Sequence, residues 1–343
     1  IGGLVSRDAL WSCPTCGACA RACPADIPIP DLIVLMRRHL ALETGEFPEG
    51  LAGALENTAS VGNPWGMDPG SRLAWAKDLD VPVAKPGVAY DVLYSVGCSA
   101  SSARRAQKIA RAMVKILKAA GIHFAVMQEE RCHGDFARRA GEEYLFQTAA
   151  AENIENLRKY QFKELVAACP HCFNTLKNEY PQFEGGTFNC VSHTVLIDRL
   201  ITEGRIKVSK SQFFTVMHDP CYLARMNGIT AEPRRVLETL GAHLREAKHS
   251  KADTLCCGAG GAQIFMDRPA RINVLRLKEL TDPKSEVVAS ACPHCLTMLT
   301  SAQAQQKEGA KDEVLFLDVA EIVAQQLESA AAEETSGSQR HGS

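Results

Sequence analysis

The sequence predicts an α/β protein in which a unit with a mostly parallel sheet occurs twice, preceded by a small helical segment. Three observations support this prediction. Short apolar runs that suit strands alternate with amphipathic stretches that suit helices, such as residues 106–120, and this alternation is typical of βα units around parallel sheets. The pentapeptide at residues 168–172 recurs letter for letter at residues 291–295, which indicates a duplication. The fourteen cysteines gather in closely spaced groups, both within the two copies and ahead of them.

Composition and charge exclude several classes of protein. With 343 residues and 46% hydrophobic content, the chain has enough apolar material for two or three units with their own cores. Its 38 basic residues are balanced by 40 acidic ones, which argues against a nucleic-acid partner because such proteins usually carry a basic surplus. No stretch reaches the about 18 to 20 apolar residues of a membrane span, and residues 1–11 lack the regions of a signal peptide. We therefore expect a soluble, cytoplasmic chain.

The composition changes along the chain predict five segments. Residues 1–42 form a small helical segment with an amphipathic helix over residues 29–42, and its start at an isoleucine suggests a truncated N-terminus. Residues 43–88 are rich in turn signals and are expected to be a linker with little regular structure. The first copy of the repeat spans residues 89–208 and the second spans residues 209–328. Residues 329–343 hold too little apolar material to order themselves and are expected to be a disordered tail.

The N-terminal segment carries one dense cysteine run, formed by Cys13, Cys16, Cys19 and Cys23 and followed by Pro24. This spacing is typical of the bacterial ferredoxin site that holds a cubane [4Fe–4S] cluster. In two-cluster ferredoxins the fourth cysteine reaches the other cluster, so Cys23 either completes this site or serves a partner run upstream of residue 1. Zinc is the alternative metal, but structural zinc sites usually separate two C-x-x-C pairs widely, so the spacing favours iron and sulfur.

The second copy of the repeat offers five thiols in three loops: Cys221, Cys256, Cys257, Cys292 and Cys295. Five thiols exceed what one zinc ion needs, whereas a cluster of several irons offers a separate metal atom to each. Pro293 predicts that a helix begins between the last two cysteines, and a helix N-terminus favours the thiolate form that binds metal. The backbone N–H groups of Gly258, Gly260 and Gly261 are expected to approach the cofactor. A phosphate-binding loop is the alternative, but Gln263 stands where the last glycine of G-x-G-x-x-G belongs.

This arrangement resembles the CCG domain of the heterodisulfide reductase superfamily, which includes iron–sulfur subunits of glycolate oxidase and lactate-utilisation proteins. The resemblance covers nearly all of the chain and implies a non-cubane [4Fe–4S] cluster at the second copy. It is strongest to membrane-associated iron–sulfur oxidoreductases, in which a two-cluster ferredoxin and often a membrane segment precede the two CCG copies. It implies a flavoprotein donor such as electron-transfer flavoprotein, a quinone or disulfide acceptor, and association with the cytoplasmic face of a membrane through an N-terminal region.

The first copy departs from this pattern at one ligand position. Its matching thiols are Cys98, Cys132, Cys169 and Cys172. His133 stands where the second cysteine of the adjacent pair belongs, and Asp135 and Phe136 replace the glycine turn. His133 either ligates iron, as histidines do in Rieske centres, or hydrogen-bonds to its neighbours, which we favour because neutral histidines are common at polar turns. We expect the two copies to be unequal, with the second copy redox-active or facing the substrate.

The remaining candidates carry weaker signals. Cys190 fits no metal-ligand spacing and is interpreted as a buried free thiol. His171 and His294, inside the two C-P-H-C loops, either tune a cluster by hydrogen bonding or lie exposed, and His218 is interpreted as a structural partner. No catalytic residue can be assigned. Three functions stay open: an iron–sulfur electron conduit, a disulfide or thiol reductase acting at the second copy, and a colourless zinc scaffold.

Overall fold

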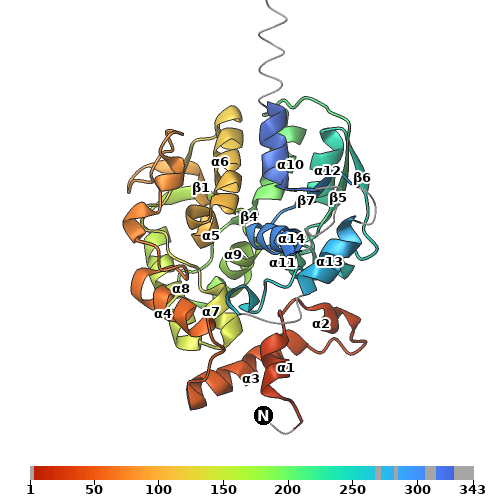
Figure 1. Cartoon of the computed structure of the whole chain (residues 1–343). Coiled ribbons are helices and arrows are strands. Elements are labelled where there is room, and N and C mark those ends of the chain that lie inside the picture. The colour runs from red at the N-terminus through yellow and green to blue at the C-terminus, as the bar shows by residue number, and fades with distance from the viewer. Residues whose placement is uncertain (1–3, 267–271, 282–284, 306–313, 328–343) are drawn as a thin grey trace, which may run out of the picture.

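Two parallel sheets flanked by helices make up most of the molecule, and a smaller helical segment covers one end of them (Figure 1). The computed structural model describes residues 4–266, 272–281, 285–305 and 314–327. Over these residues no helix combines the length and the apolar character that a membrane crossing requires. The architecture is α/β, as predicted from the alternation of strand and helix patterns.

The first sheet has the strand order β2-β1-β3-β4, and all its neighbouring strands are parallel. Leu93, in the middle of β1, pairs with Ala125 on one side and Leu165 on the other. Parallel strands need crossover connections, and helices supply them here. The strands are β1 (Ala89–Ser95), β2 (Phe124–Val126), β3 (Gln161–Ala167) and β4 (Cys190–Ser192), and the main helices are α6 (Arg104–Ala119), α8 (Glu143–Leu157) and α10 (His193–Thr202).

The second sheet repeats this topology with the strand order β6-β5-β7-β8, again all parallel. The same order in both sheets confirms the duplication that the repeated pentapeptide indicates. A further helix runs over residues 319–327 within the described part of the chain. The strands are β5 (Phe213–Met217), β6 (Ala242–Arg245), β7 (Val287–Ser290) and β8 (Leu315–Asp318), and the main helices are α12 (Ala231–Thr239), α13 (Ile272–Thr281) and α14 (Pro293–Gln305).

The two copies share one hydrophobic core. A single buried cluster contains Val92 and Val166 from the first sheet together with Val216 and Val288 from the second. Helix α6 of the first copy packs on α14 of the second, and α10 packs on α12. Where β4 and β8 end, His193 Nε2 lies 3.0 Å from Asp318 Oδ1, and both side chains are buried. Each copy therefore completes its packing with parts of the other.

The N-terminal segment consists of α1 (Arg7–Ser12), α2 (Ala18–Ala22) and α3 (Ile29–Thr44). The amphipathic helix predicted over residues 29–42 is thus present. On this helix Leu32 and Leu35 are exposed, whereas Val34 and Arg37 are buried. The Arg37 guanidinium donates hydrogen bonds to carbonyl oxygens on three parts of the molecule, and this accounts for a cation on the inner face of the helix.

Residues 43–88 are more regular than the sequence suggested. They contain the eleven-residue helix α4 (Leu51–Val61) and two short 3₁₀ turns, η1 (Pro69–Ser71) and η2 (Ala74–Ala76). The helix follows Gly50 and ends at Gly62, whose φ of 75° closes the last turn in the left-handed conformation that glycine tolerates. The expectation of little regular structure in this segment is therefore wrong. The tail predicted over residues 329–343 lies outside the described residues.

Candidate metal centre

The nine predicted ligand cysteines of the two copies gather where the carboxyl ends of the strands meet the N-terminal segment. Cys98 lies in α5 (Gly97–Ser102), just after β1, and Cys221 begins α11 (Cys221–Asn227), after β5. Cys169 caps α9 (Pro170–Asn174) after β3, and Pro293 begins α14 after β7, as the proline signals predicted. Parallel strands place their carboxyl ends at one edge of a sheet, so thiols that are distant in sequence meet there. All fourteen cysteines are free.

The four thiols of the first copy, named the copy-1 thiols, are Cys98, Cys132, Cys169 and Cys172. A hydrogen bond with Cys98 and burial raise the pKa of Cys132 well above its ordinary value. Hydrogen bonds with Cys172 and Cys292 lower the pKa of Cys169 well below its ordinary value, which favours the thiolate form that binds metal. A void of about 40 Å³ lies beside Cys98, Cys132 and Cys172.

His133 is held among polar groups beside the copy-1 thiols. Its Nε2 lies 3.4 Å from Ser95 Oγ and 3.8 Å from Glu130 Oε1, and Glu130 in turn pairs with Arg72 at 2.7 Å. Burial lowers the pKa of His133 although Glu130 opposes this shift. These contacts support the interpretation of His133 as a hydrogen-bonding residue, although its buried Nδ1 has no partner within the part of the chain that the structure describes.

The five thiols of the second copy, named the copy-2 thiols, are Cys221, Cys256, Cys257, Cys292 and Cys295. All five are buried. Cys256 is central, because it hydrogen-bonds with Cys221 and Cys257, and Cys257 continues the contact to Cys295. The backbone N–H of Gly258 donates to Cys256 Sγ at 3.2 Å, as expected for a glycine that serves a thiolate site. A set of four or five buried thiols in mutual contact suits an iron–sulfur cluster.

His218 adjoins the copy-2 thiols, with one ring nitrogen within 4.8 Å of the sulfur atoms of Cys257 and Cys295. Its Nδ1 accepts a hydrogen bond from Arg276 Nε at 3.0 Å, and an arginine can only donate. Burial lowers the pKa of His218, which favours the neutral ring. The neutral ring must then carry its proton on Nε2, so His218 faces the sulfurs as a hydrogen-bond donor and not as a ligand. Sequence reasoning assigned it only a structural role.

The two thiol sets meet at the junction between the copies. Cys169 of the first copy hydrogen-bonds with Cys292 of the second. The imidazole of His171 stacks on the ring of Tyr222 at 4.1 Å between centroids and lies 5.7 Å from His294. His171 is buried, so the alternative of an exposed position is wrong.

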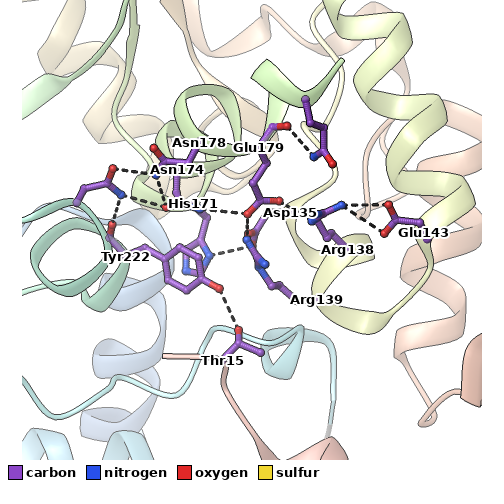
Figure 2. A network of polar contacts seen from close by, with 12 residues as sticks. Thr15, Asp135, Arg138, Arg139, Glu143, His171, Asn174, Asn178, Glu179 and Tyr222 are labelled. Atoms are coloured by element: carbon purple, nitrogen blue, oxygen red, sulfur yellow. Dashed lines mark hydrogen bonds and ion pairs between the residues drawn. The ribbon is translucent and has the colours of Figure 1, made fainter. Parts of the chain in front are cut away.

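A polar network continues from this junction on both sides (Figure 2). On one side Tyr222 Oη lies 3.0 Å from Thr15 Oγ1 of the N-terminal segment. On the other side His171 Nδ1 lies 2.9 Å from Asp135 Oδ2, and Arg139 Nε donates to Asp135 Oδ1 at 3.2 Å. Burial lowers the pKa of His171, but Asp135 outweighs it and holds the pKa above its ordinary value. Sequence reasoning missed Tyr222 and Arg139, which carry no metal-ligand spacing.

The N-terminal loop, defined as residues 13–16, docks on the copy-2 thiols. Cys16 hydrogen-bonds with Cys256, and this bond is the main cause that lowers the pKa of Cys16 to about 6. Arg225 Nη1 donates to the carbonyl oxygen of Cys16 at 2.7 Å. A Cβ on Gly260 would lie 2.5 Å from the Pro14 carbonyl oxygen. This glycine therefore lets the N-terminal loop approach, and its role toward a cofactor stays a prediction.

Gly261 and the remaining cysteines of the N-terminal run have their own contacts. A Cβ on Gly261 would lie 2.3 Å from the Cys13 carbonyl oxygen, so this glycine also admits the loop. Cys13 interacts electrostatically with Cys16 and Cys19, so these three thiols lie together. The Cys23 thiol accepts hydrogen bonds from the backbone N–H groups of residues 27 and 25, which lower its pKa.

Comparison with known proteins agrees with this geometry. The family model described as CCG, cysteine-rich domain, matches residues 92–177 and 215–300. The probable membrane-anchored ferredoxin of Chromohalobacter salexigens is 40% identical over 334 residues, which cover 95% of this chain and 49% of the relative. The EtfAB:quinone oxidoreductase of Syntrophomonas wolfei is 34% identical over 341 residues, which cover 95% of this chain and 47% of the relative. This chain thus spans about half the length of both relatives.

A third relative is covered over most of its length. It belongs to the dihydromethanophenazine:CoB–CoM heterodisulfide reductase of Methanosarcina barkeri and is 31% identical over 332 residues, which cover 94% of this chain and 78% of the relative. Both matches to the family model fall on the repeated units that hold the copy-1 and copy-2 thiols. On these grounds the chain belongs to the CCG cysteine-rich domain family.

Proposed function

We propose that this chain conducts single electrons from a flavoprotein donor, such as electron-transfer flavoprotein, to quinone. One observation carries the proposal: three sets of thiols are in direct contact from end to end, through Cys16 with Cys256 and through Cys169 with Cys292. A catalyst with one reactive centre has no need of this continuity. The names of two relatives, EtfAB:quinone oxidoreductase and probable membrane-anchored ferredoxin, support this donor, this acceptor and a place at a membrane.

The residues that would hold the cofactors are the thiols of the N-terminal run, the copy-1 thiols and the copy-2 thiols. The [4Fe–4S] clusters proposed for them are of the cubane type at the N-terminal run and of the non-cubane type at the copy-2 thiols. When bound, they would accept and release one electron at a time. The protein's own contribution is position: eight of the nine thiols of the two copies are buried, and the Gly258 N–H donates a hydrogen bond that stabilises negative charge on the Cys256 sulfur.

The order of contacts between the thiol sets suggests the order in which an electron passes them. The N-terminal loop touches the copy-2 thiols through Cys16, and the copy-2 thiols touch the copy-1 thiols through Cys292. This order favours the second copy as the intermediate station and the first copy as the end of the path. It departs from our expectation that the second copy faces the substrate.

A disulfide or thiol reductase is the second candidate, because a component of a heterodisulfide reductase is among the relatives. Substrate would have to enter between the two thiol sets, beside His171 and His294. The void there measures about 40 Å³ and is lined by copy-1 thiols as well. The contact between the thiol sets favours conduction over this second candidate.

Replacing Cys257 with serine tests the proposed ligand set, and Cys190→Ser is the matched control. Cys190 is partly buried on β4, and burial raises the pKa of its thiol to about 12. Both variants would be purified without oxygen, and iron and sulfide would be counted. We expect Cys257→Ser to lose the copy-2 signal in a redox titration followed by EPR, with the chain still folded, and Cys190→Ser to match the unmodified chain. Equal iron content in the two variants would contradict the assignment.

The direction of electron flow needs a separate experiment. The iron-loaded chain would be mixed with reduced electron-transfer flavoprotein, and its visible absorption would be followed before and after addition of quinone or of a disulfide. We expect bleaching by the flavoprotein and recovery with quinone. Recovery with the disulfide alone would favour the reductase. A chain that is colourless after anaerobic iron loading would reject both redox functions, since zinc is d¹⁰ and does not absorb.

A further inference from the structure

A pocket on the first copy includes one of the copy-1 cysteines in its lining. It lies between α4 and α8, which are neighbours in Figure 1, has a volume of about 360 Å³, and includes Cys132 in its lining. The Cys132 backbone is fixed there, since its N–H donates to the Gly62 carbonyl oxygen at 2.8 Å and its carbonyl oxygen accepts from Asn153 Nδ2 at 3.0 Å. A molecule in this pocket would therefore lie against a proposed cluster ligand held in a constant position.

The walls of this pocket are mainly apolar and come from both helices. The side chains that form them are those of Phe47, Ala52, Leu55, Ala59, Leu145 and Ala149. Polar groups also line the pocket: the carboxylates of Glu56, Glu142 and Glu152, the hydroxyls of Thr58, Tyr144 and Thr148, and Arg131, whose Nε pairs with Glu152 Oε2 at 2.9 Å. Pockets of about 300 to 1,000 Å³ with apolar walls and a small number of polar groups are typical of small-molecule sites.

The second copy does not offer this access in the described part of the chain. There the N-terminal loop covers the corresponding thiols, with Cys16 packed against Cys221, Tyr222 and Cys256. The backbone of the loop leaves no room for a Cβ on Gly260, so the contact is close. The asymmetry agrees with the order of contacts along the thiols, in which the first copy is the terminal station.

We propose that the pocket between α4 and α8 binds the ring of the quinone acceptor beside Cys132. This inference rests on the proposed function and adds the place where conduction ends. The apolar walls suit a flat ring with an isoprenoid tail, and the Arg131 guanidinium is a hydrogen-bond donor in the lining for a quinone oxygen, beside the hydroxyls of Thr58, Tyr144 and Thr148. Reduction of one quinone to hydroquinone takes two electrons, delivered singly from the first copy, and two protons, taken from water at the open mouth of the pocket.

Two filling variants test the site from its opposite walls. Ala59 and Thr148 are both exposed and line the pocket, so tryptophan at either position would fill it without burying a new side chain in the core. The matched controls are Ser60→Trp and Gln147→Trp, which lie next to them on the same helices, are exposed, and do not line the pocket. The probe is menadione, a tailless quinone, and its binding to the oxidised, iron-loaded full chain is measured by equilibrium dialysis.

We expect Ala59→Trp and Thr148→Trp each to weaken menadione binding at least tenfold, and the two controls to stay within twofold of the unmodified chain. Reoxidation of the reduced chain by menadione should slow in the filled variants, whereas reoxidation by ferricyanide, which needs no pocket, should not change. Unchanged menadione binding in both filled variants, or no binding to the unmodified chain, would overturn the inference.

Failure of this inference can be told apart from failure of the proposed function. If the flavoprotein reduces the chain and quinone reoxidises it, but the filled variants behave as the controls do, the proposed function stands and the proposed site is rejected. If the chain binds menadione in the pocket but accepts no electron from the flavoprotein, the proposed site stands and the proposed donor is rejected. Iron content, measured in every variant, shows whether the copy-1 thiols have been disturbed by the substitution.

Discussion

Replacing Arg37 with methionine should loosen the N-terminal segment from both copies. This fully buried guanidinium donates to the carbonyl oxygens of Leu10 and Cys13 in its own segment, to Arg139 of the first copy and to Gly261 of the second, at 2.5 to 3.0 Å. Methionine keeps the unbranched stem and removes every donor. The four carbonyl oxygens then lack the hydrogen bonds that Arg37 donates.

The size of the effect follows from the count of these bonds. A hydrogen bond to a charged group contributes about 1.5 to 3 kcal/mol, and the variant no longer has to bury a charge, which offsets several kcal/mol of the loss. We expect a net cost of about 3 to 5 kcal/mol for local opening of the segment, as for other buried pairs that lose one partner. At 1.4 kcal/mol per tenfold, opening becomes roughly one hundred to several thousand times more frequent.

Hydrogen exchange followed by mass spectrometry measures this opening directly, in peptides that cover α1 and α3. The matched control is Arg38→Met, because Arg38 is the next residue in the same helix and makes a partly exposed ion pair with Glu143 at 2.6 Å. Such pairs contribute about 1 kcal/mol or less, so its exchange should rise no more than about fivefold by the same conversion. Equal exchange rates in the two variants would refute the role given to Arg37.

Three further predictions concern other parts of the site. Glu130→Gln leaves the buried Arg72 without its carboxylate partner, so we expect a loss of about 3 kcal/mol from the first copy in denaturant titrations; an unchanged midpoint would contradict this. Gly261→Ala should expose the N-terminal segment to protease, because its Cβ meets a loop carbonyl oxygen, whereas Gly53→Ala, which has open space, should not. His218→Phe should lower the copy-2 midpoint potential by up to about 60 mV, since one hydrogen bond contributes about 0.5 to 1.5 kcal/mol; a rise would reject His218 as a donor to sulfur.

Much of the fold could be predicted from local patterns. The alternation of strands and helices, the duplication and the placement of the thiols after strand ends all depend on short stretches of sequence, and all are present in the structure. The helix α4 was missed because Gly53 and the turn residues around it weaken the helical signal. Arg37 was missed for a related reason, since a cation is normally a sign of an exposed position.

The relations between the parts of the site could not be predicted. Cysteine spacing indicates which thiols share a loop, but not that Cys16 meets Cys256 or that Cys169 meets Cys292. The same limit applies to Gly260, whose close approach to a carbonyl oxygen of the N-terminal loop no local pattern indicates. These contacts depend on how the N-terminal segment and the two copies pack together. The sequence of one of these segments does not indicate which residues of another it contacts.

The shared core of the two copies has a consequence for how the two sites could diverge. If two separate identical chains paired through such a core, symmetry would force both sites to carry the same ligands, and any substitution would appear twice. In the present molecule both copies lie on one chain, with His193 of one meeting Asp318 of the other. A histidine can therefore replace a thiol in the first copy while the second copy keeps all five. Because the two copies are covalently fused, this symmetry does not constrain them, and their ligand sets can differ.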